Sequence, residues 1–467
     1  MKFKPMLLSL LAVTALASCG GGTTPTASSQ PAGGESTSGG SGTKTKIDLT
    51  VWAGETNDSL NYAREVAAAF NATQTEYEYN FSFKPVSEAS VSGDWSSDPE
   101  NAADFAIAAD DQIPSMISAG HIQNLEALSS DKFIPGLANT IKGRNSSESI
   151  DVASANGKTY GFPVSASNGY ILYYNTEFIN KEDTTSFESL LAAIKRVSER
   201  DGKNYRFGFP TNSGWYLDGW FRGAGFSVYG EPGKSTVDCD WDQTKDGVSG
   251  TDVAASLVRL AHGEYRDYWT SQKEENLMTQ VDASQPKRII ATINGTWSFN
   301  TLKGAWGDDK VGATVLPTYN LERNEGKTIG MQSVKGFKVA VINAKRKSLL
   351  HSAKFAEFFT NYENQKTRFE KLSELPTNTK AAADVNPKSN PAVSALADQW
   401  ERGAFTEQVN AAYWGPSNGL CNQLTDGTAG ELGSFIKSGA GTSDLVLDYD
   451  NIAAAVKACV DKLGGKI

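Results

Sequence analysis

Short apolar runs alternate with amphipathic stretches along most of the chain. Near the start, apolar residues recur at helical spacing over 60–70, between runs of strand length at 46–52 and 81–86. A third run at 103–108 is followed by a helical stretch at 112–119. Strands and helices that alternate in this order are typical of an α/β protein with a doubly wound sheet.

A later block, residues 288–343, predicts three more strands separated by polar loops. The runs are 289–293, 311–316 and 337–342. The first run ends at the turn pair Asn294-Gly295, and Trp297 comes just past that turn. Because ligands of open α/β sheets lie at the carboxyl ends of the strands, Trp297 is a candidate ligand contact.

The same block carries three short motifs in a fixed order. They are Ile293-Asn294-Gly295-Thr296-Trp297, Leu316-Pro317-Thr318, and a strand from Gly336 to Ile342-Asn343. In these motifs the chain resembles the extracellular solute-binding proteins of sugar ABC transporters, of the maltose-binding-protein type, and the resemblance covers roughly residues 44–430. It implies a periplasmic-binding-protein-like α/β fold, in which two doubly wound lobes are joined by hinge crossings around a ligand cleft. It also implies a binding protein without cofactors or catalytic residues.

The first 43 residues are expected to be an export signal and a tether. In residues 1–18, two lysines precede an apolar run that is too short to span a bilayer, as in a secretory signal. The ending Leu16-Ala17-Ser18-Cys19 looks like a bacterial lipobox, which implies cleavage before Cys19 and its acylation. A plain signal peptide with a chance cysteine is the alternative. Residues 19–43 are rich in Gly, Ser, Thr, Pro and Ala, which predicts a flexible linker behind the lipidated cysteine.

The resemblance divides the rest of the chain into two lobes. Residues 44–165 with 331–376 are expected to form the first α/β lobe, and residues 166–330 with 377–467 the second.

One hinge crossing is expected at Phe162–Ala166, because a Gly-x-Pro strand crosses between the lobes in the family. Ser167 or Asn168 lies at its exit, where the family often has a glutamate, and Asn168 can both donate to and accept from a sugar hydroxyl.

Carboxylates and amides that follow the strands of the first lobe are candidate ligands of sugar hydroxyls. By resemblance, Glu55 and Asn57 follow the first strand and Asp111 follows the third, with Asp110 as an alternative of similar weight. A carboxylate accepts several hydroxyl hydrogen bonds, and charge-assisted bonds are the stronger kind. A helix N-cap or a solvated loop charge is the plain alternative for such residues. Ala108 stands where the family has an aromatic side chain.

Aromatic side chains are the candidates in the second lobe. Tyr216 belongs to a stretch with three large rings in six residues, bracketed by glycines. Such rings suit the flat, CH-rich faces of pyranoses, with burial in the core as the alternative. By resemblance, Trp297 stacks on sugar, and Tyr413 and Trp414 form a late aromatic pair that faces the cleft.

Composition and charge narrow the function classes. The 467 residues are 39% hydrophobic and 21% charged, which is ordinary for a globular protein with room for two lobes. A net charge of −10, without a long basic run, makes nucleic acid an unsuitable partner. The three histidines are far apart and the cysteines lack zinc spacing, so no metal site is expected. Outside the cell, Cys239, Cys421 and Cys459 leave two alternatives: one disulfide between two of them, or three separate buried thiols.

The expected function is that of a receptor held by lipid on the outer face of the bacterial cytoplasmic membrane, or in the periplasm where an outer membrane exists. A monomer is expected to bind a carbohydrate, a malto-oligosaccharide first, to close on it and to deliver it to an ABC transporter permease. The alternative is a surface lipoprotein that binds or degrades glycans. A glycosidase needs two carboxylates about 5–10 Å apart across one bond, and the adjacent Asp110 and Asp111 offer no such pair.

Overall fold

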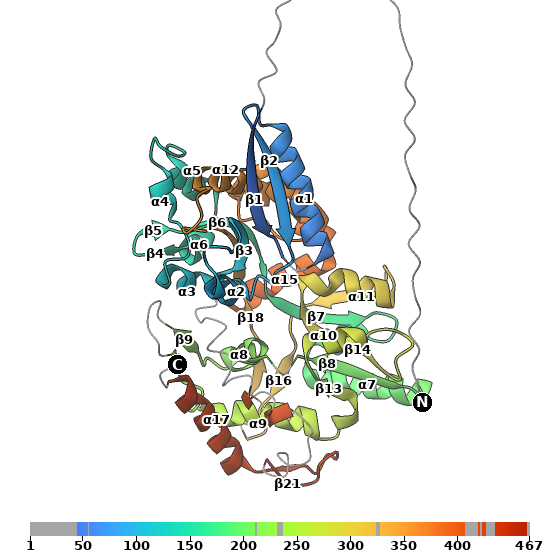
Figure 1. Cartoon of the computed structure of the whole chain (residues 1–467). Helices are drawn as coiled ribbons and strands as arrows, with labels where there is room; N and C mark the ends of the chain where they lie inside the picture. Colours follow the sequence, from blue (N-terminus) through green and yellow to red (C-terminus); the bar gives the residue numbers. More distant parts are fainter. Residues whose placement is uncertain are drawn as a thin grey trace, which may run out of the picture. The chain divides into compact units, whose positions relative to one another are not determined.

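The computed structural model of the chain describes residues 44–54, 56–210, 213–230, 237–323, 327–406, 419–420, 423–425 and 435–464. Within it, residues 44–467 form one compact unit that contains two five-stranded sheets (Figure 1). We call the part built on the first sheet the first lobe and the part built on the second sheet the second lobe.

The first sheet has the strand order β2-β1-β3-β19-β6. Its strands are β1 (Thr45–Trp52), β2 (Tyr77–Lys84), β3 (Phe105–Ala109), β6 (Phe162–Asn168) and β19 (Gly336–Ile342). The first three are parallel, and β19 runs antiparallel to both of its neighbours. A strand from late in the sequence therefore completes the sheet between two early strands.

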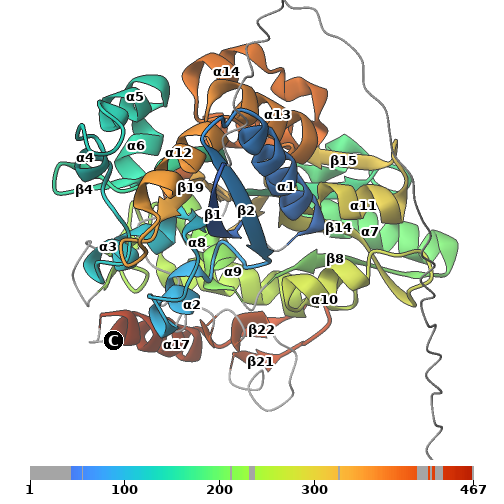
Figure 2. The same ribbon diagram turned by 45° about the horizontal axis from the view of Figure 1, so that its top comes forward.

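Helices cover both faces of the first sheet. The side chains of β3 alternate between two apolar clusters, because successive residues of a strand point to opposite faces. Phe105 and Ile107 pack with α1 (Asn57–Ala72) and α12 (Leu349–Phe359), whereas Ala106 and Ala108 pack with α2 (Val91–Ser97) and α3 (Ile113–Ser118). Both views show α1 beside β1 and β2 (Figures 1 and 2).

The second sheet has the strand order β13-β8-β14-β7-β15. Its strands are β7 (Tyr170–Asn175), β8 (Asn204–Phe209), β13 (Trp269–Ser271), β14 (Lys287–Gly295) and β15 (Val311–Thr314). One face packs on α7 (Phe187–Asp201), α8 (Gly214–Gly223), α9 (Gly250–His262) and α17 (Tyr449–Leu463), and the other on α10 (Glu274–Thr279), α11 (Phe299–Trp306) and α15 (Pro391–Arg402). Two layered sheets of this kind confirm the predicted α/β fold with two doubly wound lobes.

Short elements complete the described fold. The remaining helices are α4 (Leu125–Leu128), α5 (Leu137–Arg144), α6 (Ser147–Val152), α13 (Tyr362–Leu372) and α14 (Thr379–Asp384). The remaining strands are β4 (Ser154–Ala155), β5 (Lys158–Thr159), β9 (Val228–Gly230), β10 (Val237–Cys239), β11 (Thr244–Lys245), β12 (Val248–Ser249), β16 (Thr318–Asn320), β17 (Thr328–Gly330), β18 (Ser333–Val334), β20 (Ala404–Phe405), β21 (Ile436–Ser438) and β22 (Val446–Leu447).

The chain passes between the two sheets where β6 leads into β7 and where β18 leads into β19. It passes again between α14, which contacts α13, and α15, which contacts β7 and β15. The first two passages touch each other, because a Cβ atom on Gly169 would lie 2.3 Å from the carbonyl oxygen of Val334. Only glycine permits this approach of two backbones. The residue boundaries predicted for the lobes stay a prediction.

Local contacts set where two of these elements begin. The N-cap of α1 is Thr56, whose hydroxyl accepts from the amide of Ser59. The second strand begins at Tyr77 instead of residue 81, because alternate aromatic side chains along it pack on α1 and α12.

Cys239 is half-buried and Cys459 is buried, and Cys421 and Cys19 lie outside the described residues. Throughout the described ranges, no helix combines the length and the apolar character needed to cross a membrane, and no group of three or more His, Cys, Asp or Glu residues has the geometry of a metal site.

Helix α8 packs so closely that one of its glycines is a test of the fold. A Cβ atom on Gly219 would lie 2.1 Å from Tyr170 Oη and 2.3 Å from the carbonyl oxygen of Gln332. We expect Gly219→Ala to destabilise the protein by about 1–3 kcal/mol through overpacking, seen as a lower melting temperature. The control is Gly143→Ala in α5. An added Cβ atom there would meet nothing within 4 Å beyond the backbone of its own helix, so the variant should have unchanged or slightly higher stability. Equal melting temperatures for the two variants would contradict the packing.

Asp218, on the same helix, makes stability depend on pH. Its side chain is 1% exposed, and its Oδ2 accepts from Arg222 Nε at 3.2 Å. Burial raises the pKa of Asp218 from 3.8 to about 6, although Arg222 opposes the shift. Folding thus favours the protonated carboxyl, and this contribution is present in full below the ordinary value and is lost as the pH rises through about 6.

Replacing Asp218 by asparagine fixes a neutral group at this position. We expect the melting temperature of Asp218→Asn, relative to the wild type, to rise by several degrees between about pH 4.5 and about pH 7.5. Thermal unfolding across this range measures the difference directly, and other titrating groups are common to both proteins. Parallel curves for the two proteins would mean that Asp218 does not titrate in the folded state in this range.

Candidate functional site

A cavity of about 760 Å³ is lined by residues of both lobes. On the first lobe much of the lining comes from the segments that follow β1, β2 and β3, including Thr56, Asp58, Ser59, Glu88 and Asp111, and the rest from β6, β19 and residues 372–374. On the second lobe it comes from the segments that follow β8, β13 and β14. Both walls therefore stand at the carboxyl ends of strands, which is where open α/β sheets bind ligands. We call this space the interlobe cavity.

Three aromatic rings form one wall of the interlobe cavity. Trp297 is 39% exposed, and its ring centroid lies 6.2 Å from that of the half-buried Trp215 at an interplanar angle of 37°. Trp215 meets Tyr216 edge-on at 4.9 Å. An exposed indole in a row of supported rings offers apolar area to a ligand at little cost in side-chain entropy. We call Trp215, Tyr216 and Trp297 the aromatic wall.

The turn Asn294-Gly295 explains how Trp297 reaches its position. A Cβ atom on Gly295 would lie 2.1 Å from the indole ring of Trp297, so the ring lies directly over a residue that has no side chain. The Oδ1 atom of the buried Asn294 accepts from the amide of Gly295 at 2.7 Å and holds the turn. The motif that stood out in the sequence is thus a support for the aromatic wall.

Glu274 fixes two of the three rings. Its Oε1 accepts from Trp297 Nε1 at 2.6 Å and its Oε2 accepts from Tyr216 Oη at 3.1 Å. Burial raises the pKa of Glu274, and these hydrogen bonds oppose the rise. Sequence reasoning missed this residue, because α10 has six mostly polar residues and only one buried side chain, Leu277.

Carboxylates face the aromatic wall from the first lobe. Asp111 lines the cavity, and its Oδ2 accepts from Gln112 Nε2 at 2.8 Å. Its neighbour Asp110 is buried, and burial, together with the charge of Asp111, raises the pKa of Asp110 well above its ordinary value. Asp111 is therefore the acid of this pair that is open to a ligand. Glu88, from the loop after β2, is a further lining acid that the sequence did not single out.

The structure brings together four of the residues proposed from the sequence. Asp111, Asn168, Tyr216 and Trp297 all line the interlobe cavity. Asn57 begins α1 as an exposed residue outside the lining, whereas Thr56, Asp58 and Ser59 beside it line the cavity. Asp110 is 4% exposed and does not belong to the lining.

Three further candidates, Glu55, Tyr413 and Trp414, lie outside the described residues. Two other tryptophans belong to the core, since Trp220 is fully buried and Trp306 is 4% exposed.

Comparison with known proteins gives relatives over most of the chain. Residues 65–395 match the family described as bacterial extracellular solute-binding protein. A maltooligosaccharide ABC transporter solute-binding lipoprotein of Streptococcus pneumoniae strain R6 is 27% identical over 339 residues, which cover 71% of this chain and 73% of that protein. A galactooligosaccharide-binding protein of Bacillus subtilis is 21% identical over 393 residues, which cover 82% of this chain and 85% of that one.

Solved structures share the fold. A maltodextrin-binding protein of L. casei BL23 matches 90% of this chain and all of its own length with a TM-score of 0.67 at 19% identity. The maltotriose-binding protein of Thermus thermophilus, bound with maltotriose, matches 89% of this chain and all of its own length with a TM-score of 0.64 at 16% identity. The periplasmic-binding-protein-like fold expected from the sequence is confirmed.

Proposed function

The chain belongs to the family of bacterial extracellular solute-binding proteins, and on this premise we propose that it is the sugar receptor of an ABC importer. Its ligand is a carbohydrate, with malto-oligosaccharides first, bound in the interlobe cavity. The relatives in Streptococcus pneumoniae and Bacillus subtilis are named for binding oligosaccharides, which supports this choice of ligand.

One observation carries the proposal, namely the aromatic wall facing carboxylates across the cavity. Trp297 and Trp215 offer apolar ring faces, and Asp111 and Asp58 stand on the opposite lobe. Sugars present CH-rich faces and rims of hydroxyl groups, so ring faces supply buried area while carboxylates accept hydroxyl protons. Asn168, which lines the cavity, is a further ligand in this proposal, and so are Glu55, Tyr413 and Trp414.

Capture works through closure of the two lobes. A sugar that touches both walls makes more contacts when the lobes are closed, so its binding shifts the population towards the closed form. The passages between the sheets absorb the rotation, as hinge segments do. The lobes correspond to residues 44–165 with 331–376 and 166–330 with 377–467.

The cellular setting follows from the leader and the family. Cys19 is acylated after cleavage of the signal, and residues 19–43 tether the receptor to the membrane. The monomeric receptor thus stays at the outer face of the membrane beside its permease. The relative in Streptococcus pneumoniae is named a lipoprotein, which supports the anchor.

The receptor has no catalytic role in this proposal. Glycoside hydrolysis needs a free acid and a second carboxylate opposite it. Both oxygens of Glu274 accept hydrogen bonds from the aromatic wall. We expect incubation with malto-oligosaccharides to return them unshortened, and the appearance of shorter products would favour the glycan-degrading alternative.

Isothermal titration calorimetry of residues 44–467 with a panel of sugars tests the ligand. We expect one site of micromolar affinity or better for maltotriose or longer α-glucans, and no saturable heat with cellotriose as the matched β-linked control. Absence of binding across the whole panel would refute the carbohydrate assignment.

A further inference from the structure

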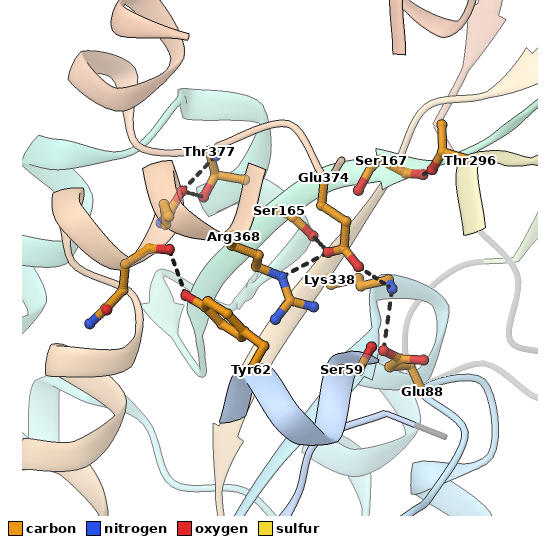
Figure 3. Close-up of polar contacts among 12 residues, drawn as sticks. Ser59, Tyr62, Glu88, Ser165, Ser167, Thr296, Lys338, Arg368, Glu374 and Thr377 are labelled. Carbon is orange, nitrogen blue, oxygen red and sulfur yellow. Dashed lines mark hydrogen bonds and ion pairs between the residues drawn. The ribbon is translucent and has the colours of Figure 1, made fainter. Parts of the chain in front are cut away.

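Four charged side chains of the first lobe meet in one cluster (Figure 3), and three of them, Glu88, Lys338 and Glu374, line the interlobe cavity. Lys338 Nζ donates to Glu374 Oε1 at 3.0 Å and to Glu88 Oε1 at 3.2 Å. Arg368 Nε donates to Glu374 Oε2 at 2.8 Å. Two cations thus balance two carboxylates. We call Glu88, Lys338, Arg368 and Glu374 the charge cluster.

The charge cluster is buried, which makes its members interdependent. Arg368 is 1% exposed and Glu374 is 7% exposed, while the side chains of Lys338 and Glu88 are 12% and 15% exposed. The neighbouring Arg368 and Lys338 hold the pKa of Glu374 well below its ordinary value against the opposing effect of burial. Removing one partner from such a cluster leaves another charge buried without compensation, which is strongly unfavourable.

The charge cluster connects the segments of the first lobe from which the chain passes between the two lobes. Lys338 is on β19, which the chain enters from the second lobe, and Ser165 is on β6, from which the chain passes to the second lobe. Ser165 Oγ donates to Glu374 Oε2 at 2.7 Å. The segment of Glu374 is bonded to β6 again, since the amide of Ala166 donates to the carbonyl of Leu375 at 2.7 Å.

The third passage, between α14 and α15, is hydrogen-bonded to the residue next to Glu374. Asn390, which caps α15, donates from Nδ2 to the hydroxyl of Ser373 at 2.6 Å, and Ser373 is the chain neighbour of Glu374.

One member of the charge cluster also belongs to the wall of the interlobe cavity. Glu88 lines the cavity with Asp111, and the carbonyl of Glu88 accepts from the amide of Ala109, the residue at the end of β3. Of the described residues that line the cavity, Lys338 is the only cation. Its ammonium group connects the wall carboxylate Glu88 with Glu374, which is bonded to β6.

We propose that Lys338 is a positioning residue that couples ligand capture to lobe movement, by tying Glu88 in the cavity wall to the crossing strands. The proposal rests on the interlobe cavity being the sugar site. Without Lys338, Glu88 loses its anchor, and β19 loses its side-chain bond to Glu374, the residue that also accepts from Ser165 of β6.

Two measurements test this role, one with ligand and one without. Lys338→Met should weaken maltotriose binding about tenfold in calorimetry, and Lys338→Arg should recover most of the loss. If Lys338 acts through Glu88, the double variant with Glu88→Gln should bind no more weakly than Glu88→Gln alone. Additive losses would contradict the coupling.

The second measurement needs no sugar. Spin labels on the exposed positions Asp131 and Lys203, one in each lobe, are placed as Asp131→Cys and Lys203→Cys in a chain whose native thiols are replaced by alanine. The distance distribution of the ligand-free protein should broaden in Lys338→Met.

The matched control is Lys142→Met, which removes the 2.7 Å ion pair with Glu126 from the first lobe, away from the cavity. It and Lys338→Arg should keep the wild-type distribution. A wild-type width in Lys338→Met would refute the proposal. Failure of the wild type to bind any sugar would refute the proposed ligand instead, and the ligand-free distances would still decide the role of Lys338.

Discussion

Replacing Trp297 by alanine is expected to weaken malto-oligosaccharide binding by at least about tenfold. The indole is 39% exposed in the interlobe cavity of the free protein, so a ligand can cover it. Roughly 100 Å² of covered ring at about 25 cal/mol per Å² corresponds to about 2.5 kcal/mol before the costs of ordering. Calorimetry with maltotriose measures the loss.

The protein offers a matched control for this change. Tyr229, on β9, is 38% exposed and lies outside the cavity lining. Tyr229→Ala should bind maltotriose like the wild type. A Trp297→Ala affinity within a factor of two of the wild type would show that the ring does not contact the ligand.

The second large effect is expected from Glu274→Gln. The variant keeps the shape of the side chain but loses the charge that accepts from both Trp297 and Tyr216. A hydrogen bond to a charged group contributes about 1.5–3 kcal/mol, so misplacement of the aromatic wall should cost about tenfold or more in affinity.

Glu177→Gln is the control for the loss of charge. Glu177 is a half-exposed residue of the second lobe that pairs with Lys310 at 2.8 Å, outside the cavity. Its variant should bind normally. Melting temperatures of the two variants separate lost binding from lost folding, and unchanged affinity in Glu274→Gln would mean that the rings hold their position without the carboxylate.

The fold was largely predictable because both sheets leave strong patterns in the sequence. The five residues of β3 and the six of β7 are buried, so they stand out as apolar runs bounded by polar residues. The limits of β2 were less predictable, since its polar residues alternate with aromatic ones and only tertiary packing sets where it begins.

The site was most predictable where a residue directly follows a strand. Trp297 and Asp111 come just after β14 and β3, and the rule for open sheets places both at the cavity. Glu274 and Glu88 are single acids in polar segments, which look the same as solvated loop charges. Lys338 stands within a buried strand, and its partners Glu88 and Glu374 are 250 and 36 residues away along the chain. Such contacts follow from the fold and leave no local signal.

Small-angle X-ray scattering of residues 44–467, with and without saturating maltotriose, shows whether the two lobes close around the ligand. If one sugar bridges the aromatic wall and the carboxylates of the first lobe, saturation should reduce the radius of gyration, because the lobes close around it. An unchanged radius, in a sample that calorimetry shows to be saturated, would contradict capture by closure.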